Sequence, residues 1–454
     1  MSIFILVSGI VLLVALIALL KLSAYLSLLL AALYIGIANR MSLPSILGAV
    51  TNGVGNTLGP LVLIIGLGVI LGSLLTETGA VQRISAGLIQ VFGAKRVKWA
   101  MVLTGLITGI AMFYNAGFIV LIPLVFSVAG ATGQPLVYLC CAMASALSVT
   151  HGFLPPHPGP SAIIVVFHAD TGKTLLYGFF VALPALLLAG VVFPEFLKKI
   201  KANPPKGIFN IQQADAVKLP GFGLSIFIAL VPVLLMGLST LAKFVLAPGS
   251  GARPEPVEGA RPALAEGAGP IWQFIGDPAI ALLITVLLAL FVLGVARGIR
   301  IKTLMQKSEA AVTAVASIIL VIAAGGVFKQ VLTDSGTGNA ITMYFKGASM
   351  SPLVLGWLVA TIVRVSIGSS TVAGFTAAGI VQPLLGPMHV HPELMVLSIG
   401  AGSLMCSHVN DTGFWMFKEY LGLSLADTFR SWTVMETIVG VTGLGGVLIL
   451  NQLV

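Results

Sequence analysis

The chain has 454 residues, of which 57% are hydrophobic and only 9% are charged. Soluble globular proteins carry about 25% charged residues, so a soluble fold is excluded and the chain must lie in a lipid bilayer. The net charge of +9 does not indicate a nucleic-acid partner, because the basic residues cluster in short loops between apolar runs, where membrane orientation requires them.

The apolar runs predict an all-α polytopic membrane protein, since a helix needs about 20 mainly apolar residues to cross a bilayer. The first run follows no basic residue and precedes no cleavage site, so we interpret it as a membrane span rather than a signal peptide. We expect about ten transmembrane helices, two of them broken. In chain order the crossings are 3–20, 22–38, 57–75, 137–168, 175–196, 221–247, 279–296, 310–331, 394–421 and 431–453.

Two further apolar blocks, 99–130 and 352–386, are each interrupted by glycine and small polar residues. The interruptions are YNAG at 114–117 and GSSTVAG at 368–374. Each half of a block is short for a full crossing, and non-helical backbone at membrane depth is tolerated only inside protein or against a wet cavity. We therefore expect two re-entrant hairpins rather than four more crossings.

Two of the crossings should be broken helices. In 137–168, the segment VTHGFLPPHPGPS contains four prolines, which cannot sustain a helix because proline lacks a donor and clashes with the preceding turn. In 394–421, the break is SHVNDTG, which carries Asp411. We expect Asp411 to be the only carboxylate at the breaks. Its insertion cost of about 2.5–3.5 kcal/mol favours a functional or tightly paired group.

The basic residues indicate which side of the membrane is cytoplasmic. With the two blocks folded as hairpins, the basic clusters at 198–206 and 297–307 fall on one side, and an excess of Lys and Arg marks the cytoplasmic side. The opposite side holds a loop at 248–271 with a tandem repeat, ARPEPVEG followed by ARPALAEG, at 252–267. Its proline, glycine and balanced charge predict a disordered external insertion, to which we assign no function.

The two halves of the chain match at one constant offset. Arg297 follows Arg40 by 257 positions, and His408 follows His151 at the same offset. An odd number of crossings separates equivalent residues, so the halves should be inverted. Inverted repeats are typical of secondary transporters, whose sites lie near the midplane where discontinuous helices meet. The expected domains are a first repeat (1–200), a cytoplasmic linker (201–220) and a second repeat (221–454).

Polar residues at membrane depth are few, and because each is costly there, each indicates a structural or functional role. The planar fork of Arg364 suits a substrate carboxylate, although Arg364 could instead form a structural bridge with Asp411. Hydroxyl and amide groups suit a polyhydroxy compound, but Ser and Thr also bond back to their own helix. The candidate substrate-binding residues are Asn115, Thr150, His151, Arg364, Ser369, Ser370, Thr371 and Asn410. The candidates for carrying a coupling proton are Asp411, His151, His157 and His408.

Four motifs carry a family resemblance: THGFLPPHPGP at 150–160, YNAGFIVLIPLVF at 114–126, GSSTVAGFTAAGI at 368–380 and SHVNDTGFW at 407–415. They resemble the gluconate permease (gluconate:proton symporter) family of the ion transporter superfamily, and the resemblance covers nearly the whole chain. It implies inverted repeats, two re-entrant hairpins, and a scaffold and mobile transport domain in an elevator-type mechanism. It also implies substrates such as gluconate and related sugar acids, or D-serine in some members. Many members read GSATVA at the second hairpin, so Ser370 and Gly374 leave the fine choice of substrate open.

The leading hypothesis is a multi-pass transporter of the bacterial inner (cytoplasmic) membrane that imports gluconate or a related small hydroxylated monocarboxylate in symport with protons. The alternative is a sodium-coupled carboxylate or D-serine transporter, with backbone carbonyls at the two breaks binding the ion. A remote alternative is an intramembrane metalloenzyme using His151, His157 and Asp411, which no HExxH-type motif supports. The exact substrate, the coupling ion and the oligomeric state, a homodimer included, stay open.

Neither catalytic activity nor a resident cofactor or metal is expected. Cys140, Cys141 and Cys406 all lie inside apolar stretches and show no metal-ligand spacing. They are best interpreted as small buried hydrophobic residues. The chain also lacks a nucleotide-binding loop of the GxxxxGK[ST] type, which argues against a primary pump.

Overall fold

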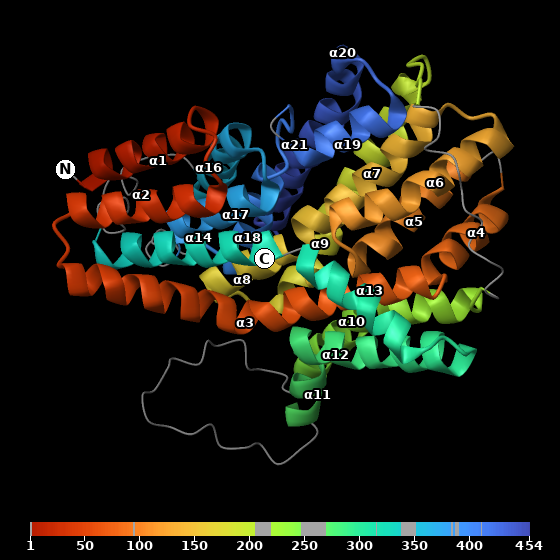
Figure 1. Cartoon of the computed structure of the whole chain (residues 1–454), viewed down its shortest axis with the longest axis horizontal. Coiled ribbons are helices and arrows are strands. Elements are labelled where there is room, and N and C mark those ends of the chain that lie inside the picture. The colour runs from red at the N-terminus through yellow and green to blue at the C-terminus, as the bar shows by residue number, and fades with distance from the viewer. Residues whose placement is uncertain are drawn as a thin grey trace.

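The computed structural model describes residues 2–93, 96–204, 219–246, 269–314, 316–336, 351–382, 385, 390–409 and 411–454. In these ranges every regular element is a helix, and the helices lie side by side in an elongated molecule (Figure 1). Seven helical stretches of this part are long and apolar enough to cross a membrane, as a polytopic all-helical protein requires. The linker expected at 201–220 and the loop expected at 248–271, with its tandem repeat, lie largely outside the described residues.

The third helix is longer than the sequence indicates. α3 (Leu43–Glu77) has 35 residues, so the crossing expected at 57–75 is only its second part. Asn52 and Asn56 interrupt the apolar run and conceal the first part of the helix. Ser42 caps α3 by accepting a hydrogen bond from the backbone N–H of Ser45 at 3.2 Å. The helices before and after it in the sequence are α1 (Ser2–Ala18), α2 (Ala24–Ala38), α4 (Ala80–Phe92), α5 (Val97–Ala111) and α6 (Tyr114–Thr132).

The proline-rich segment separates two helices. α7 (Leu136–Phe153) ends where Leu154 adopts an extended conformation. α8 (Pro158–Phe167) begins with a proline, which is tolerated there because the first helical residue needs no N–H donor. In the second half, α18 (Pro392–Gly402) and α19 (Thr412–Leu421) are likewise separate helices. Both breaks leave helix ends whose backbone N–H and C=O groups lack intrahelical partners.

Each interrupted apolar block is a pair of helices joined by a short tip. α16 (Pro352–Ile367) and α17 (Ser370–Val381) are separated by Gly368 and Ser369. Gly368 has a φ of 85°, a left-handed conformation that favours glycine, so the chain turns there.

The tip of the first block differs from the expected interruption at 114–117. The helices α5 and α6 are separated by Met112 and Phe113, and YNAG forms the first turn of α6. Gly117 serves packing rather than a turn, because a Cβ there would lie 3.0 Å from Cδ2 of Leu147. A glycine required for close approach looks the same in a sequence as a glycine required for a turn.

The remaining helices complete both halves around these segments. In the first half, α9 (Thr171–Ala185) continues into η2 (Leu186–Val192) and η3 (Phe193–Leu197). The others are α10 (Phe222–Leu246), α11 (Gly269–Ile275), α12 (Pro278–Leu288), η4 (Ala289–Gly294), η5 (Val295–Arg297), α13 (Ile301–Ala314), α14 (Ala316–Asp334), α20 (Leu425–Thr428), η7 (Phe429–Thr433) and α21 (Val434–Leu450). The crossing expected at 310–331 therefore lies mainly in α14, and the residues of α13 before it are more polar.

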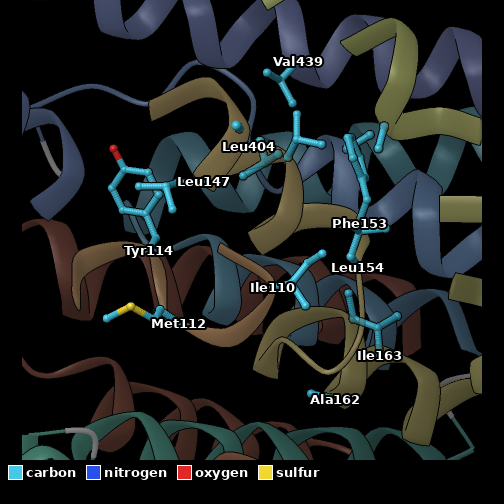
Figure 2. Close-up of a cluster of buried hydrophobic side chains, with 14 of the residues drawn as sticks. Ile110, Met112, Tyr114, Leu147, Phe153, Leu154, Ala162, Ile163, Leu404 and Val439 are labelled. Atoms are coloured by element: carbon cyan, nitrogen blue, oxygen red, sulfur yellow. The ribbon is translucent and has the colours of Figure 1, made fainter. Parts of the chain in front are cut away.

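The core lies where α7 and α18 meet. A Cβ added to Gly400 would lie 2.2 Å from the carbonyl oxygen of Gly152, so the two helix backbones are in direct contact. Phe153, Leu404 and Val439 pack around this contact and are buried (Figure 2). The broken ends of α7 and α18 therefore lie in a tightly packed part of the molecule.

Candidate substrate site

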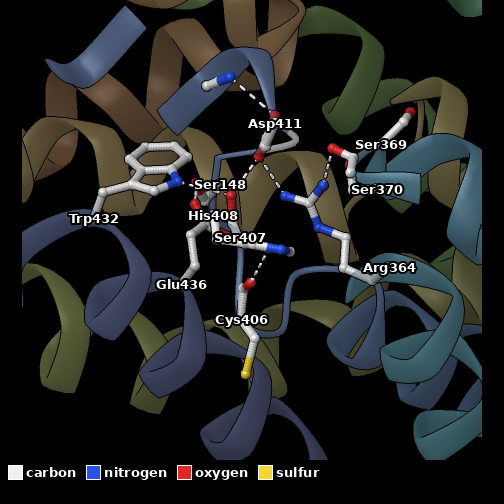
Figure 3. A network of polar contacts seen from close by, with 12 residues as sticks. Ser148, Arg364, Ser369, Ser370, Cys406, Ser407, His408, Asp411, Trp432 and Glu436 are labelled. Carbon is white, nitrogen blue, oxygen red and sulfur yellow. Dashed lines mark hydrogen bonds and ion pairs between the residues drawn. The ribbon is translucent and has the colours of Figure 1, made fainter. Parts of the chain in front are cut away.

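An ion pair lies beside the tip of the second hairpin (Figure 3). Arg364 belongs to the last turn of α16 with 3% of its side chain exposed, and Asp411 precedes α19 with 17% exposed. The guanidinium group of Arg364 donates through Nη2 to Asp411 and through Nη1 to the carbonyl of Gly368. Its Nε has no hydrogen-bond partner among the described residues. The two charges of the pair cancel, yet the buried Nε–H of Arg364 is still available as a donor.

The carboxylate of Asp411 receives hydrogen bonds from three directions. Besides Arg364, the hydroxyl of Ser407 donates to Oδ2, and the backbone N–H of Gly413 donates to Oδ1 at 2.9 Å. The last contact also caps the N-terminus of α19, where negative charge is favoured. These donors satisfy an ionised carboxylate, so the structural bridge considered from the sequence is present.

Ser407 connects this ion pair to η7, which directly precedes the last helix, α21. The indole Nε1 of Trp432 donates to Oγ of Ser407 at 2.7 Å, and the hydroxyl of Thr433 donates to the Ser407 carbonyl at 2.5 Å. The ring of Trp432 also meets the ring of Tyr114 edge to face, with centroids 5.5 Å apart. The break between α18 and α19 is therefore held in place by η7 and by the first turn of α6.

Trp432→Phe tests this support. The variant keeps most of the ring packing but removes the donor to Ser407, which should cost about 0.5–1.5 kcal/mol. We expect a lower melting temperature in detergent and a severalfold lower uptake of substrate, because Ser407 then orients Asp411 less well. An unchanged melting temperature together with full uptake would show that the Trp432 contact does not support the site.

Two histidines of the first half reach this region. Nε2 of His151 and Oγ of Ser370 are 2.8 Å apart, so a hydrogen bond joins the broken end of α7 to the second hairpin. Nε2 of His157 donates to the carbonyl of Gly109 near the end of α5. The two imidazole rings meet edge to face with centroids 5.4 Å apart. His151 therefore contacts the hairpin tip directly, whereas His157 connects α8 to α5.

A small cavity lies beside the contact between His151 and Ser370, and Thr371 and Ser403 also line it. Its volume of about 10 Å³ has room for a single water molecule. A six-carbon acid does not fit into this space. The site is therefore closed in this conformation, and a substrate needs movement of the hairpin tip or of the broken helices to enter.

Glu436 in the first turn of α21 is a second buried carboxyl group of the region, and it lies outside the two breaks at which Asp411 is the expected carboxylate. It is 1% exposed, and its Oε1 accepts a hydrogen bond from the hydroxyl of Ser148 on α7. Figure 3 shows Ser148 and Glu436 in the same network as Asp411 and Arg364. The signal in the sequence is an acidic residue inside the apolar run 431–453, where a charged group is costly, but it lies outside the broken segments that mark the site.

Two candidates from the first half have other surroundings. Thr150 is fully buried, and its hydroxyl donates to the carbonyl of Leu147 at 2.8 Å, so it bonds back to its own helix. It also packs on α5, where a Cβ at Gly109 would lie 2.5 Å from its Oγ1. Asn115 lies in the first turn of α6 with an exposed side chain. Neither side chain contacts the ion pair.

Three candidates from the second half complete the set. Oγ of Ser369 caps α17 by accepting from the backbone N–H of Val372 at 3.4 Å. Nδ1 of His408 donates to the carbonyl of Cys406 at 3.1 Å, which fixes the loop between α18 and α19. Asn410 lies outside the described residues. Of the candidates that are described, six are thus grouped around the hairpin tip: Arg364, Asp411, His151, Ser369, Ser370 and Thr371. The side chains of Thr150, His157 and His408 bond to backbone carbonyls elsewhere, and Asn115 is exposed.

Relatives match the chain along its whole length. It is 43% identical to the Gnt-II system L-idonate transporter of Escherichia coli (strain K12), with 99% of both chains covered. It is 42% identical to a high-affinity gluconate transporter of the same organism and 41% identical to the gluconate permease of Bacillus subtilis (strain 168), with 100% of each chain covered.

Two solved transporters have a similar fold. The YdaH transporter of Alcanivorax borkumensis matches with a TM-score of 0.59 at 17% identity, covering 89% of this chain and 87% of that one. MtrF of Neisseria gonorrhoeae matches with a TM-score of 0.56 at 15% identity, covering 88% and 82%. At such low identities the likeness concerns the fold alone. Residues 1–454 match the family described as GntP family permease, and the chain therefore belongs to this family of membrane permeases rather than to a family of enzymes.

Proposed function

We propose that the chain imports gluconate, or a related small hydroxylated monocarboxylate, across the bacterial inner (cytoplasmic) membrane together with protons. The observation that carries the proposal is the buried guanidinium group of Arg364, which stands at a hairpin tip between two broken helices and keeps one donor unused. An arginine fork binds a carboxylate through two parallel hydrogen bonds. The names of the relatives, which specify L-idonate and gluconate, agree with a sugar-acid anion.

The substrate hydroxyl groups would contact the polar side chains beside the tip. His151, Ser370 and Thr371 line the small cavity there, next to Arg364 on the same hairpin. Thr150 is left out of this set because its hydroxyl is already used within its helix. Opening of the tip would widen the cavity and expose these groups together.

The proton has an electrostatic role in this proposal. A substrate anion that enters beside Asp411 shares one arginine with it, and a buried charge without compensation is strongly disfavoured. A proton bound in the same site supplies the missing positive charge. Over a full transport cycle, import of one anion with one proton then transfers no net charge across the membrane.

The arrangement of helices supports inverted repeats and movement of an elevator type. At the offset of 257 residues, α5, α6 and α7 correspond to α16, α17 and α18, and α5 packs on α7 as α16 packs on α18. Arg297 donates to the carbonyl of Thr78 at 2.8 Å, and the equivalent residues Arg40 and Ser335 line one cleft together. We propose that the hairpins and broken helices form the mobile domain and that the outer helices form the scaffold.

Uptake by purified protein in liposomes tests the proposal. With a pH gradient, acid outside, we expect radiolabelled gluconate to accumulate, and excess L-idonate to compete with it. Collapse of the gradient by a proton ionophore should abolish accumulation. Uptake that depends on sodium at fixed pH, or competition by D-serine but not by sugar acids, would support the alternative coupling or substrate instead.

A further inference from the structure

Glu436 is a buried carboxyl group that forms no ion pair with a described basic residue. Ser148 donates to its Oε1, and its Oε2 has no partner among the described residues. With 1% of the residue exposed, water does not solvate the group. An ionised carboxylate in such surroundings is strongly disfavoured relative to the neutral acid, because its lost hydration is not replaced. These surroundings favour the protonated form of Glu436 in this conformation.

Asp411 has the opposite surroundings. Its carboxylate contacts the guanidinium group of Arg364, a hydroxyl and a backbone N–H, all of which donate. One site thus holds two carboxyl groups, of which one is compensated as an anion and the other is not. Such a difference in surroundings is typical of sites in which one carboxyl group stays ionised and the other binds and releases a proton.

Few other titratable groups face Glu436. Tyr114 of α6 and Cys141 of α7 face it from the first half, and within the described part of the chain the charges that act on it are those of Arg364 and Asp411. Arg364 is already engaged by Asp411 and the Gly368 carbonyl. On the other elements packed against α21, Glu393 of α18 accepts from the backbone N–H of Asp170 and lies near Tyr177 of α9, and Lys173 of α9 and Arg430 of η7 are exposed.

We infer that Glu436 is the group that binds and releases the coupling proton, an inference that rests on the proposed import of an anion with protons. When Glu436 is ionised, the site holds two carboxylates against one guanidinium group, and a substrate carboxylate would be a third anion. When Glu436 binds a proton (–COO⁻ + H⁺ → –COOH), the charges of Arg364 and Asp411 cancel. The site is then neutral before the substrate binds, and one anion can enter. Loss of this proton on the cytoplasmic side then expels the substrate.

The decisive variant is Glu436→Gln, whose amide resembles the protonated acid in shape but cannot titrate. In liposomes, a gradient of one pH unit should let the wild-type protein accumulate gluconate about tenfold, since one unit is a tenfold driving force for one proton. The variant should exchange internal for external gluconate but show no accumulation. Its affinity for gluconate, measured by calorimetry, should be independent of pH, whereas the affinity of the wild-type protein should fall as pH rises.

Matched variants separate this role from a role in folding. Glu393→Gln removes another buried carboxyl group of the same half and should leave accumulation unchanged. Glu436→Asp keeps a titratable group and should retain accumulation with a shifted pH profile, which covers the case in which Glu436→Gln does not fold.

The outcomes distinguish this inference from the proposed function. If the wild-type protein transports gluconate without regard to the pH gradient, the proposed coupling fails. If the wild-type protein is coupled and Glu436→Gln accumulates gluconate equally well, the inference about Glu436 is wrong and another group carries the proton. Loss of exchange as well as accumulation in a folded Glu436→Gln protein would also overturn it, because Glu436 would then serve substrate binding.

Discussion

Arg364→Lys is expected to lower gluconate uptake roughly 100-fold, because each charge-assisted hydrogen bond contributes about 1.5–3 kcal/mol and each 1.4 kcal/mol is tenfold. The guanidinium group holds Asp411 and the Gly368 carbonyl at the same time and keeps Nε available. A lysine ammonium is a point charge that keeps the ion pair but cannot present a planar fork to a second carboxylate. Initial rates of radiolabelled gluconate uptake in proteoliposomes measure the effect.

Two further variants show whether the loss is one of substrate binding or of folding. Arg430→Lys changes an exposed arginine, with 75% of its side chain exposed, and should leave uptake unchanged. Arg364→Gln combined with Asp411→Asn removes both charges, so neither remains buried without a partner. The double variant should fold but not transport. Recovery of uptake in the double variant would mean that Arg364 serves only to neutralise Asp411.

Gly400→Ala should destabilise the protein by about 1–3 kcal/mol or more, because a methyl group inserted into a well-packed contact forces the backbones apart. The added Cβ would lie 2.2 Å from the carbonyl oxygen of Gly152, and neither atom belongs to a flexible side chain. Separation of α7 from α18 also widens the distance between the two breaks. We expect a marked loss of monodisperse protein in detergent, a lower melting temperature and little uptake.

Gly445→Ala is the matched control for this substitution. Gly445 lies in α21, and a Cβ there meets nothing within 4 Å. Alanine is favoured over glycine in a helix by about 0.5–1 kcal/mol, so the melting temperature should stay the same or rise slightly. Similar losses in both variants would contradict the interpretation that the contact between α7 and α18 is what requires glycine.

The helical breaks were predictable because their causes are local. Prolines at 155–160 cannot continue a helix whatever packs around them, and Gly368 permits a left-handed turn on its own. The first hairpin tip and the full length of α3 were not predictable in the same way. In both places, polar or glycine residues occupy helical positions because of tertiary packing, which a sequence pattern does not show.

The charged centre of the site was predictable in part. An arginine and an aspartate at membrane depth stand out in an apolar chain, and their pairing was one of the alternatives. The network behind them depends on contacts between distant segments, such as Trp432 with Ser407 and Ser148 with Glu436. Residues 148 and 436 are far apart in the sequence, and no local motif connects a serine on one helix with a glutamate on another.

The hydrogen bond between His151 and Ser370 has a consequence for the opening of the site. Among the described residues, this hydrogen bond joins the side chains of α7 to the tip of the second hairpin. A hydrogen bond of this kind contributes about 0.5–1.5 kcal/mol net, so its rupture reduces the population of a state by roughly tenfold at most. This hydrogen bond alone is therefore too weak to keep the tip closed. Most of the free energy that holds the closed conformation must come from the packing of α17 on α8 and α14, so the opening of the site depends on apolar contacts rather than on the polar contact at the tip.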